Sequence, residues 1–322
     1  MRFRFHHLHV ELRGAGPALD AARTLFGGFP SIDASGEADL VVNLRPAAAT
    51  PRLPSPSDFF HGTIDCHAVG DDVILSDGFS RSRVHGGGRL VEIDVADESL
   101  GDLHMFAQVF LLISIVLALR WRHLFHVHAG ALVSPSGAGI LVTGTAGAGK
   151  STLSLALLEA GCSYLGDDAV FLTVRDDGPV VLSLPRPFHV APQTIAAFPR
   201  IAPFVGSILP NGKKWNLDAR ATWPGREREE IVAPDVLLLP EVADREETEV
   251  QPLGASVGLG ALLESSTYVV VDDLPARSAH LDALRRLADG AKAYRVKLGA
   301  DLLHAPVRTA NRILSAVGAE TG

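Results

Sequence analysis

Residues 144–151 read GTAGAGKS, and this short stretch constrains the fold of the chain more than any other. It matches the phosphate-loop pattern G-x-x-x-x-G-K-[ST]. An apolar run, Ile140–Thr143, precedes it, and the helical pattern Leu153–Leu158 follows. Because the mechanism of such a loop requires a strand before it and a helix after it, the sequence predicts an α/β nucleotide-binding core here.

The residue types in the loop explain how it would hold phosphate. Glycines leave the backbone N–H groups free to wrap a phosphate chain, and the helix that follows points its N-terminus at the same charges. We expect Lys150 to reach the β- and γ-phosphates and the Ser151 hydroxyl to bind Mg²⁺. The predicted nucleotide-binding residues are Gly144, Thr145, Ala146, Gly147, Ala148, Gly149, Lys150, Ser151 and Thr152.

An acidic pair, Asp167-Asp168, follows the loop at a spacing that geometry explains. A helix over Ser151–Ala160 climbs about 15 Å away from the loop. Gly161 is a typical helix stop, and an extended return to Gly166 covers about the same distance. The two carboxylates are therefore predicted to return beside the bound phosphates. One of them could hold the metal, and the other could accept a proton from an incoming hydroxyl.

A second acidic pair offers an alternative. Asp272 and Asp273 follow the apolar run Tyr268–Val271, an arrangement that suits the metal-positioning strand of an ATPase. This alternative is a nucleotide-regulated ATPase or binding protein that uses Asp272. We favour Asp167-Asp168, because its distance from the loop follows from geometry whereas nothing in the sequence fixes the place of Asp272.

The same residues resemble a known family. The strand residues His128–Leu132, the turn Pro135–Gly139, the loop Gly144–Ser151 and the run Leu165–Asp168 are similar, in order and spacing, to the catalytic core of HPr kinase/phosphorylase and the HPr-kinase-related kinases. The clear match covers about residues 120–175. The resemblance implies an α/β fold with a mixed-sheet P-loop kinase core, the type that these enzymes share with phosphoenolpyruvate carboxykinase.

The resemblance also implies roles for individual residues. His128 would lie close to the acidic pair, Asp167 would be the base that deprotonates the acceptor hydroxyl, and Asp168 would help Ser151 to hold the metal. With Lys150, this makes Asp167 and His128 the predicted catalytic residues.

The implied activity is transfer of the γ-phosphoryl group of ATP, with Mg²⁺, to a hydroxyl group. The acceptor would be a peptide, a protein or a small molecule, with serine as the expected residue. The downstream glycine-rich signature of the bifunctional enzymes is not found, which favours the related-kinase branch. A carboxykinase-like enzyme acting on a small carboxylate stays open as a third interpretation.

Composition limits the other functional classes. The chain has 322 residues, is 47% hydrophobic and carries a net charge of −8, so a large core is expected and nucleic-acid binding is not. Cys66 and Cys162 show no metal or disulfide spacing, which indicates a cytoplasmic protein. The apolar run Phe106–Leu119 is shorter than the roughly 20 residues that span a bilayer, so we interpret it as a buried helix joining two parts of the protein. A homo-oligomer is compatible with the sequence.

The chain divides into two predicted regions. Residues 1–100 form a small β-rich N-terminal region with hairpin turns, and residues 101–322 form the kinase domain. The predicted strands include Asp39–Leu44, Thr63–Val69, Val73–Leu75, Arg89–Val95, Val170–Val174, Val180–Leu184, Val236–Leu239, Tyr268–Val271 and Tyr294–Leu298, and the predicted later helices are Ala255–Leu263, Ala279–Ala288 and one from Pro306 to about Val317.

Three further patterns bear on the site. Alternation around Phe125 predicts that His126 and His128 share one face of a single strand. Arg186, in a proline-bounded extended segment, could face the phosphates or solvent. Residues 203–225 are rich in Pro and Gly and include Lys213 and Lys214, so they are either a loop that closes over the nucleotide or a solvated turn.

Overall fold

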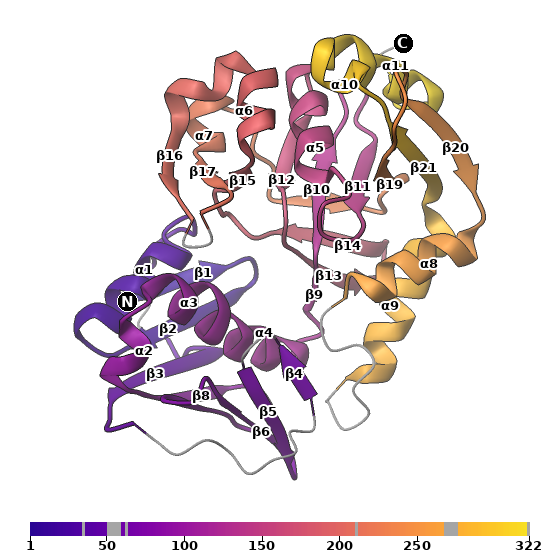
Figure 1. Cartoon of the computed structure of the whole chain (residues 1–322). Coiled ribbons are helices and arrows are strands. Elements are labelled where there is room, and N and C mark those ends of the chain that lie inside the picture. The colour runs from indigo at the N-terminus through magenta and orange to yellow at the C-terminus, as the bar shows by residue number, and fades with distance from the viewer. Residues whose placement is uncertain (34–35, 50–58, 62–63, 210–211, 267–275, 321–322) are drawn as a thin grey trace. The chain divides into compact units, whose positions relative to one another are not determined.

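A computed structural model describes residues 1–33, 36–49, 59–61, 64–209, 212–266 and 276–320 (Figure 1). The chain groups into two compact units. The N-terminal unit contains Met1–Leu124 together with Val270–Arg277, and the C-terminal unit contains Phe125–Val269 and Ser278–Gly322. The sequence-based division into domains at residue 100 stays a prediction. The boundary between the two compact units falls between Leu124 and Phe125.

The described strands of the N-terminal unit form one mixed sheet. They are β1 (Arg2–Phe5), β2 (Leu8–Arg13), β3 (Leu40–Pro46), β4 (Phe59–His61), β5 (Ile64–Val69), β6 (Asp72–Ser76), β7 (Arg81–Val84) and β8 (Leu90–Val95). Their order is β1-β2-β3-β8-β7-β6-β5-β4, with β3 parallel to both of its neighbours. Strands β5, β6, β7 and β8 pair in this order, each antiparallel to the next, which confirms the predicted hairpins. Strand β7 was not predicted.

Helix α1 (Gly16–Phe26) joins the parallel strands β2 and β3. It has a proline in its first turn, which suits a helix start. Its buried residues, which include Leu19, Ala22 and Phe26, recur at helical spacing. This helix could therefore have been predicted from the sequence.

The apolar run forms one nearly continuous helical stretch in the N-terminal unit. It comprises α3 (Leu103–Met105), the π-helix η1 (Phe106–Leu111) and α4 (Leu112–Arg120), after the short α2 (Asp97–Leu100). By length and composition Leu103–Arg120 could cross a membrane, and 72% of it is buried within the structure. Helix α4 packs against β7 and β8. The predicted burial of this helix is therefore confirmed, but the helix lies within the N-terminal unit instead of joining two parts of the protein.

The main sheet of the C-terminal unit is also mixed, as the family resemblance implies. Among the described residues its strands are β10 (Ala129–Val133), β11 (Gly139–Thr143), β12 (Ser163–Gly166), β19 (Val236–Val242), β20 (Glu249–Leu253) and β21 (Lys292–Leu298). The order is β12-β10-β11-β19-β21-β20, with β11, β19 and β21 parallel and the other neighbours antiparallel. The predicted strands near residues 236 and 294 are confirmed.

Two smaller sheets complete this unit in the described part of the chain. The first, β18-β14-β13-β9, is antiparallel and contains β9 (Phe125–Val127), β13 (Val170–Arg175), β14 (Gly178–Ser183) and β18 (Glu230–Val232). The second, β15-β17-β16, contains β15 (Phe188–Val190), β16 (Val205–Ile208) and β17 (Trp215–Leu217). Residues 203–225 were predicted to be a loop or a turn. Part of this stretch is instead regular, because β16 and β17 pair there.

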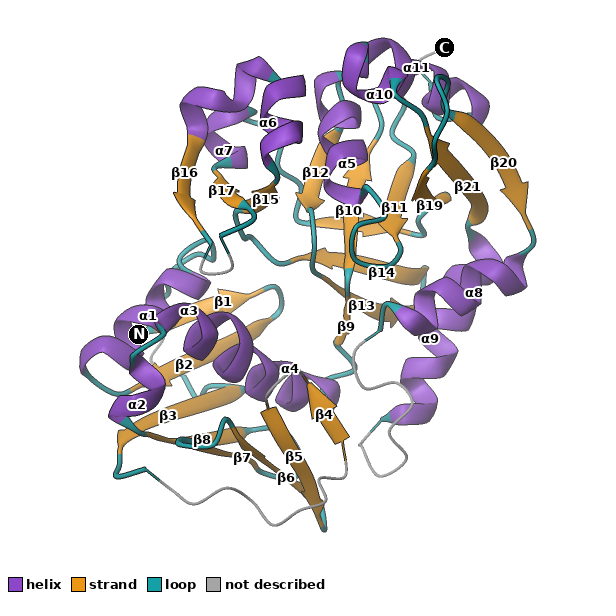
Figure 2. Cartoon of the chain, viewed as in Figure 1, coloured by secondary structure: helices purple, strands orange, loops and turns teal. Residues whose placement is uncertain are grey.

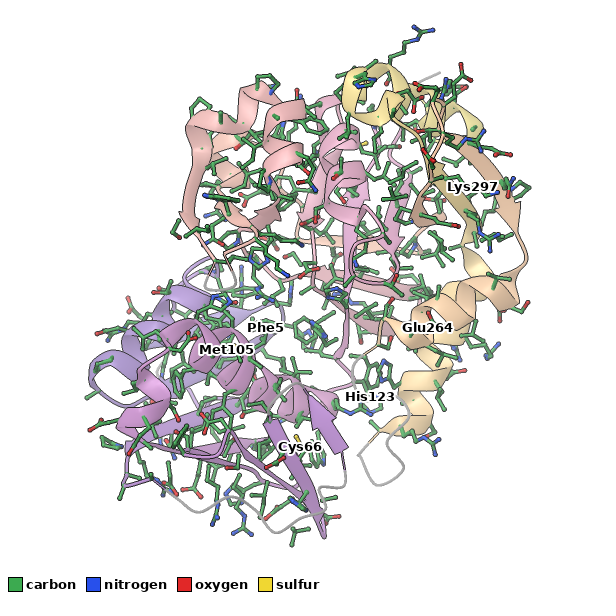
Figure 3. The ribbon with its side chains drawn as sticks, viewed as in Figure 1. Phe5, Cys66, Met105, His123, Glu264 and Lys297 are labelled. Atoms are coloured by element: carbon green, nitrogen blue, oxygen red, sulfur yellow. The ribbon has the colours of Figure 1, made fainter. Side chains whose placement is uncertain are left out.

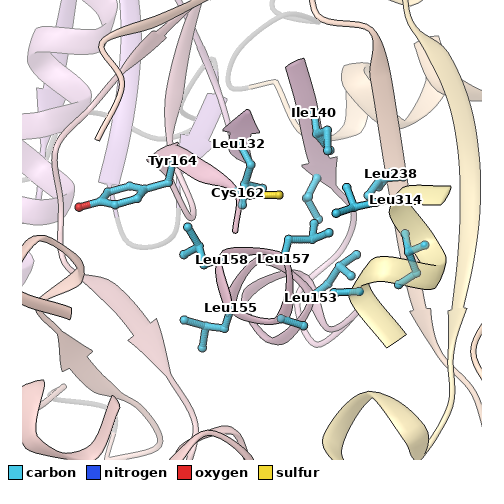
Figure 4. Close-up of a cluster of buried hydrophobic side chains, with 14 of the residues drawn as sticks. Leu132, Ile140, Leu153, Leu155, Leu157, Leu158, Cys162, Tyr164, Leu238 and Leu314 are labelled. Carbon is cyan, nitrogen blue, oxygen red and sulfur yellow. The ribbon is translucent and has the colours of Figure 1, made fainter. Parts of the chain in front are cut away.

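The helices of the C-terminal unit include those that the sequence predicts. They are α5 (Lys150–Glu159), α6 (Pro192–Ala197), α7 (Ala219–Thr222), α8 (Ala255–Glu264), α9 (Arg277–Gly290), α10 (Asp301–His304) and α11 (Pro306–Ala316), with a 3₁₀ turn at Pro199–Phe204. Helix α5 packs against β10, β11 and α11. Its leucines at 153, 155, 157 and 158 are all buried, because neighbours surround it, and they form the centre of the core cluster in Figure 4.

The turn between β7 and β8 provides a test of the packing of α4. Gly87 and Gly88 both have positive φ, but only at Gly88 would a Cβ meet other atoms, the carbonyl oxygen of Ala118 and the Cβ of Trp121. We expect Gly87→Ala to lower the free energy of unfolding by about 1 kcal/mol, from backbone strain alone. Gly88→Ala should lower it by about 3 kcal/mol or more, because overpacking adds to the strain. Urea denaturation measures both, and equal losses would contradict this packing.

Candidate functional site

Three strand ends of the main sheet meet at one edge. Strand β10 runs antiparallel to both β11 and β12, so the carboxyl ends of β11 and β12 lie beside the amino end of β10. The register pairs Ala129 with Thr143 and Ala131 with Gly166. Residues His128, Gly144 and Asp167, each next to one of these ends, therefore leave the sheet at the same edge. Because neighbouring strands lie about 4.8 Å apart, the backbones of β11 and β12 are separated by only about 10 Å.

The same edge is where the chain changes sheets. His128 lies between β9 of the four-stranded sheet and β10 of the main sheet, and Asp167-Asp168 lies between β12 of the main sheet and β13 of the four-stranded sheet. Strands β9 and β13 pair with each other just as β10 and β12 do. Two chain segments therefore cross side by side from one sheet to the other. Two of the three predicted catalytic residues, His128 and Asp167, lie at the crossing.

This crossing corrects one sequence-based prediction. His126 and His128 do not share one face of a single strand, because the strand ends at Val127 and a new one begins at Ala129. His126 instead packs edge-on against Phe171, with ring centroids 5.8 Å apart. The alternation in the sequence is real, but it conceals a change of sheet.

The loop between β11 and α5 has the backbone that a phosphate loop needs (Figure 2). Gly144, Gly147 and Gly149 have φ values of 146°, 83° and 95°, a region that other residues rarely adopt. Helix α5 begins directly at Lys150. The Lys150 ammonium group donates hydrogen bonds to the carbonyl oxygens of Gly144 at 2.7 Å and Thr145 at 3.2 Å, so it folds back over the loop.

The two acids occupy different surroundings. The Oδ1 atom of Asp168 lies 3.2 Å from Nε2 of His128, and these side chains are 38% and 44% exposed. Asp167 is only 4% exposed. No described residue donates a hydrogen bond of normal length and angle to either Asp167 oxygen, although the Ser151 hydroxyl and the His189 backbone N–H lie near enough to stabilise its charge.

Burial sets the protonation of the site. It raises the pKa of Asp167 from 3.8 to about 7, with the negative charge of Asp168 adding to the rise and Ser151 opposing it. It also lowers the pKa of His128, against the attraction of Asp168. At neutral pH the imidazole is therefore neutral.

Lys150 and two further cations act on the acids. Burial lowers the pKa of Lys150, and the nearby charges of Asp168 and Asp167 oppose this. Lys214, in the connection between β16 and β17, acts electrostatically on Lys150 and on Asp167. Arg186, just before β15, acts on His128 and on Asp168. Sequence analysis did not decide whether Arg186 and Lys214 face the site or solvent. In the structure both lie near enough to act on its charged groups.

Gly130, to which sequence analysis gave no individual role, lies close to the backbone of Asp167. A Cβ on Gly130, within β10, would come within 3.0 Å of the backbone oxygen of Asp167 and of the Ser154 hydroxyl. Strand β10 therefore lets the Asp167 backbone approach closely. A glycine inside an otherwise apolar strand is the signal that could have indicated this.

The donor set of the site fits a magnesium ion. The two buried Asp167 oxygens lack hydrogen bonds of normal geometry from described residues and lie near the Ser151 hydroxyl, and hard oxygen donors are the ligands that Mg²⁺ prefers. Among the described residues no cluster of three His, Cys, Asp or Glu side chains could hold a metal. The alternative acid Asp272 lies outside the described residues.

The fold and the site define a mixed α/β protein with a glycine-rich loop beside paired acids. No family model matches the chain. It is 41% identical over 70 residues to an HPr kinase/phosphorylase of Lactobacillus delbrueckii subsp. bulgaricus, a match that covers 22% of each chain. It is also 41% identical over 57 residues to an HPr kinase/phosphorylase of Geobacillus sp. (strain WCH70), covering 18% of each.

The chain is therefore related to HPr kinase/phosphorylases, as its motifs predict. It matches only about a fifth of the length of these curated relatives. Among solved structures, the Hpr(Ser) kinase/phosphatase from Coxiella burnetii aligns with 59% of this chain and 96% of its own, at 15% identity and a TM-score of 0.30.

The buried Asp167 makes stability depend on pH. Its pKa is about 7 in the folded protein and 3.8 as its ordinary value, so the folded state holds the proton more tightly. Stability is therefore lost as pH rises from about 4 to about 7. We expect Asp167→Asn to be more stable than the wild type by about 2–4 kcal/mol at pH 8, and by little at pH 4. Urea denaturation at both pH values tests this, and a difference that does not grow with pH would contradict it.

Proposed function

We propose that this protein is an ATP- and Mg²⁺-dependent phosphotransferase with a core of the HPr kinase/phosphoenolpyruvate carboxykinase type. The observation that carries the proposal is the common sheet edge at which His128, the glycine-rich loop and Asp167-Asp168 meet. The names of its relatives, HPr kinase/phosphorylases, support phosphoryl transfer, and the family resemblance implies a serine hydroxyl as the acceptor. The acceptor itself would be a peptide, a protein or a small molecule.

The loop would bind the triphosphate. Backbone N–H groups of residues 144–149 and the amino end of α5 supply positive charge for the phosphates. The Lys150 ammonium group would exchange its bonds to the Gly144 and Thr145 carbonyls for the β- and γ-phosphates. Mg²⁺, when bound, would neutralise charge on the phosphate oxygens.

One acid would hold the metal and the other would accept the proton of the acceptor hydroxyl. The surroundings of Asp167 and Asp168 indicate how these two roles are divided. A pKa of about 7 for Asp167 suits the base that the family resemblance implies. Its 4% exposure does not suit contact with an incoming hydroxyl, and its place beside Ser151 suits a metal ligand. Asp168, half-buried beside His128, is open to the acceptor. We therefore propose that Asp167 holds the metal with Ser151 and that Asp168 accepts the proton.

His128 and the two extra cations would assist the transfer. Neutral His128 can donate a hydrogen bond from Nε2 to Asp168 and so hold that carboxylate toward the acceptor. Arg186 acts on His128, and Lys214 acts on Asp167, so both bring positive charge to the site. Because charge on the transferred group is spread over its oxygens, cations placed beforehand stabilise the transition state.

We also propose a cytoplasmic location. The cysteines Cys66 and Cys162 are both free and buried. Burial raises the pKa of each thiol to about 12, which leaves both thiols unreactive.

Replacing Lys150 tests the phosphate site. We expect Lys150→Ala to reduce phosphoryl transfer from ATP by about 100-fold or more, because a charge at the β- and γ-phosphates is lost. The measurement uses γ-labelled ATP with HPr and serine peptides as acceptors, and mass spectrometry locates the phosphate. Lys292→Ala, a change at an exposed lysine that begins β21, is the control and should keep full activity. Transfer at the wild-type rate by Lys150→Ala would refute the proposal.

Replacing each acid in turn assigns the base. We expect Asp168→Asn to lower kcat by about 10²–10⁴ with little change in the Mg²⁺ concentration required. Asp167→Asn should instead raise that Mg²⁺ requirement at least about tenfold, because a carboxylate ligand is lost. Magnesium titrations of kcat measure both effects. The reverse pattern would show that Asp167 is the base, as the family resemblance implies.

A further inference from the structure

Ser265 makes two hydrogen bonds that join separate parts of the site. It follows Glu264, the last residue of α8, which is labelled in Figure 3. The Ser265 hydroxyl bonds to the hydroxyl of Thr143, and its backbone oxygen accepts a hydrogen bond of 2.7 Å from the His128 N–H. Ser265 is only 8% exposed.

Both partners adjoin the proposed machinery. Thr143 is the last residue of β11, directly before the glycine-rich loop. His128 is the residue at which the chain changes sheets, so its N–H lies between the strands β9 and β10. The Ser265 oxygen accepts from this N–H and so satisfies a backbone donor at the point where the ladder hydrogen bonds of the two sheets are interrupted.

We propose that Ser265 is a positioning residue that holds the start of the phosphate loop and His128 in a fixed relation. The inference rests on the proposed function, in which the loop holds the donor and His128 orients the Asp168 base. Phosphoryl transfer needs donor and base aligned to within a fraction of an ångström. A side chain that bonds to Thr143 while its backbone bonds to His128 supplies such an alignment without touching either reactant.

The neighbouring serine offers a matched control. Ser266 is also 8% exposed and also lies beside the site, pairing with Val127 in an isolated bridge. Its buried hydroxyl, however, has no hydrogen-bond partner among the described residues. Ser265→Ala and Ser266→Ala therefore remove the same atom from adjacent buried positions, and only the first removes a link to the loop.

The single variants separate positioning from binding. The probe is ATP hydrolysis, in which water takes the place of the acceptor. We expect Ser265→Ala to lower kcat about tenfold while the dissociation constant for Mg·ATP changes less than about twofold, because the loop itself is intact. Ser266→Ala should match the wild type in both values. Equal kcat values for the two variants would overturn the inference.

A double variant separates positioning from stability. Ser265→Ala leaves the Thr143 hydroxyl buried and unpaired, which lowers the melting temperature, and adding Thr143→Val removes that hydroxyl. We expect the double variant to regain much of the lost melting temperature but to keep the low kcat. If kcat recovers together with stability, Ser265 has only a structural role and the inference is wrong.

Amide hydrogen exchange without nucleotide decides the point independently of the reaction. In the double variant we expect the His128 amide to exchange about tenfold faster than in the wild type, while amides of β19 exchange as before. Unchanged exchange at His128 would overturn the inference even if the protein proves to be a kinase. If the wild type neither binds nor uses ATP, the proposed function fails, and faster exchange at His128 would still support the role of Ser265.

Discussion

The antiparallel pairing of β10 with both β11 and β12 is the constraint on which the rest of the site depends. It brings the carboxyl ends of β11 and β12 and the amino end of β10 to one edge of the sheet. This strand pairing alone is enough to bring the glycine-rich loop, His128 and the two acids close together. Gly130 and Ser265 refine this arrangement, the first by allowing the Asp167 backbone to approach and the second by bonding to Thr143 and His128.

The arrangement has an energetic cost that the core must offset. Asp167 is buried with no hydrogen bond of normal geometry from a described residue, and a carboxylate in such surroundings is held in its neutral form up to about pH 7. The buried leucines of α5, the helix that begins at the end of the loop, supply apolar burial next to it. A poorly satisfied acid beside a rigid core is typical of a group that gains its partner only with a ligand.

Much of the site could be predicted from local sequence. The loop, α5, the stop at Gly161 and the return strand β12 follow from glycine chemistry and helical spacing, and the structure has each of them. The change of sheet at His128, the burial of Asp167 and the bonds of Ser265 could not be predicted, because each depends on strands distant in sequence. Local alternation is the same on both sides of His128, so it indicated one strand where there are two. The family resemblance supplied the residues of the site but not the difference in exposure between the two acids.

The central claim is that the two acids face the terminal phosphate of a nucleotide held by the loop. A crystal structure with Mg²⁺ and a non-hydrolysable ATP analogue tests it most directly. The account predicts that the terminal phosphorus lies within about 6 Å of a carboxylate oxygen of Asp167 or Asp168. A terminal phosphorus more than about 10 Å from both carboxylates, too far for a shared metal ion or a direct proton transfer, would contradict it.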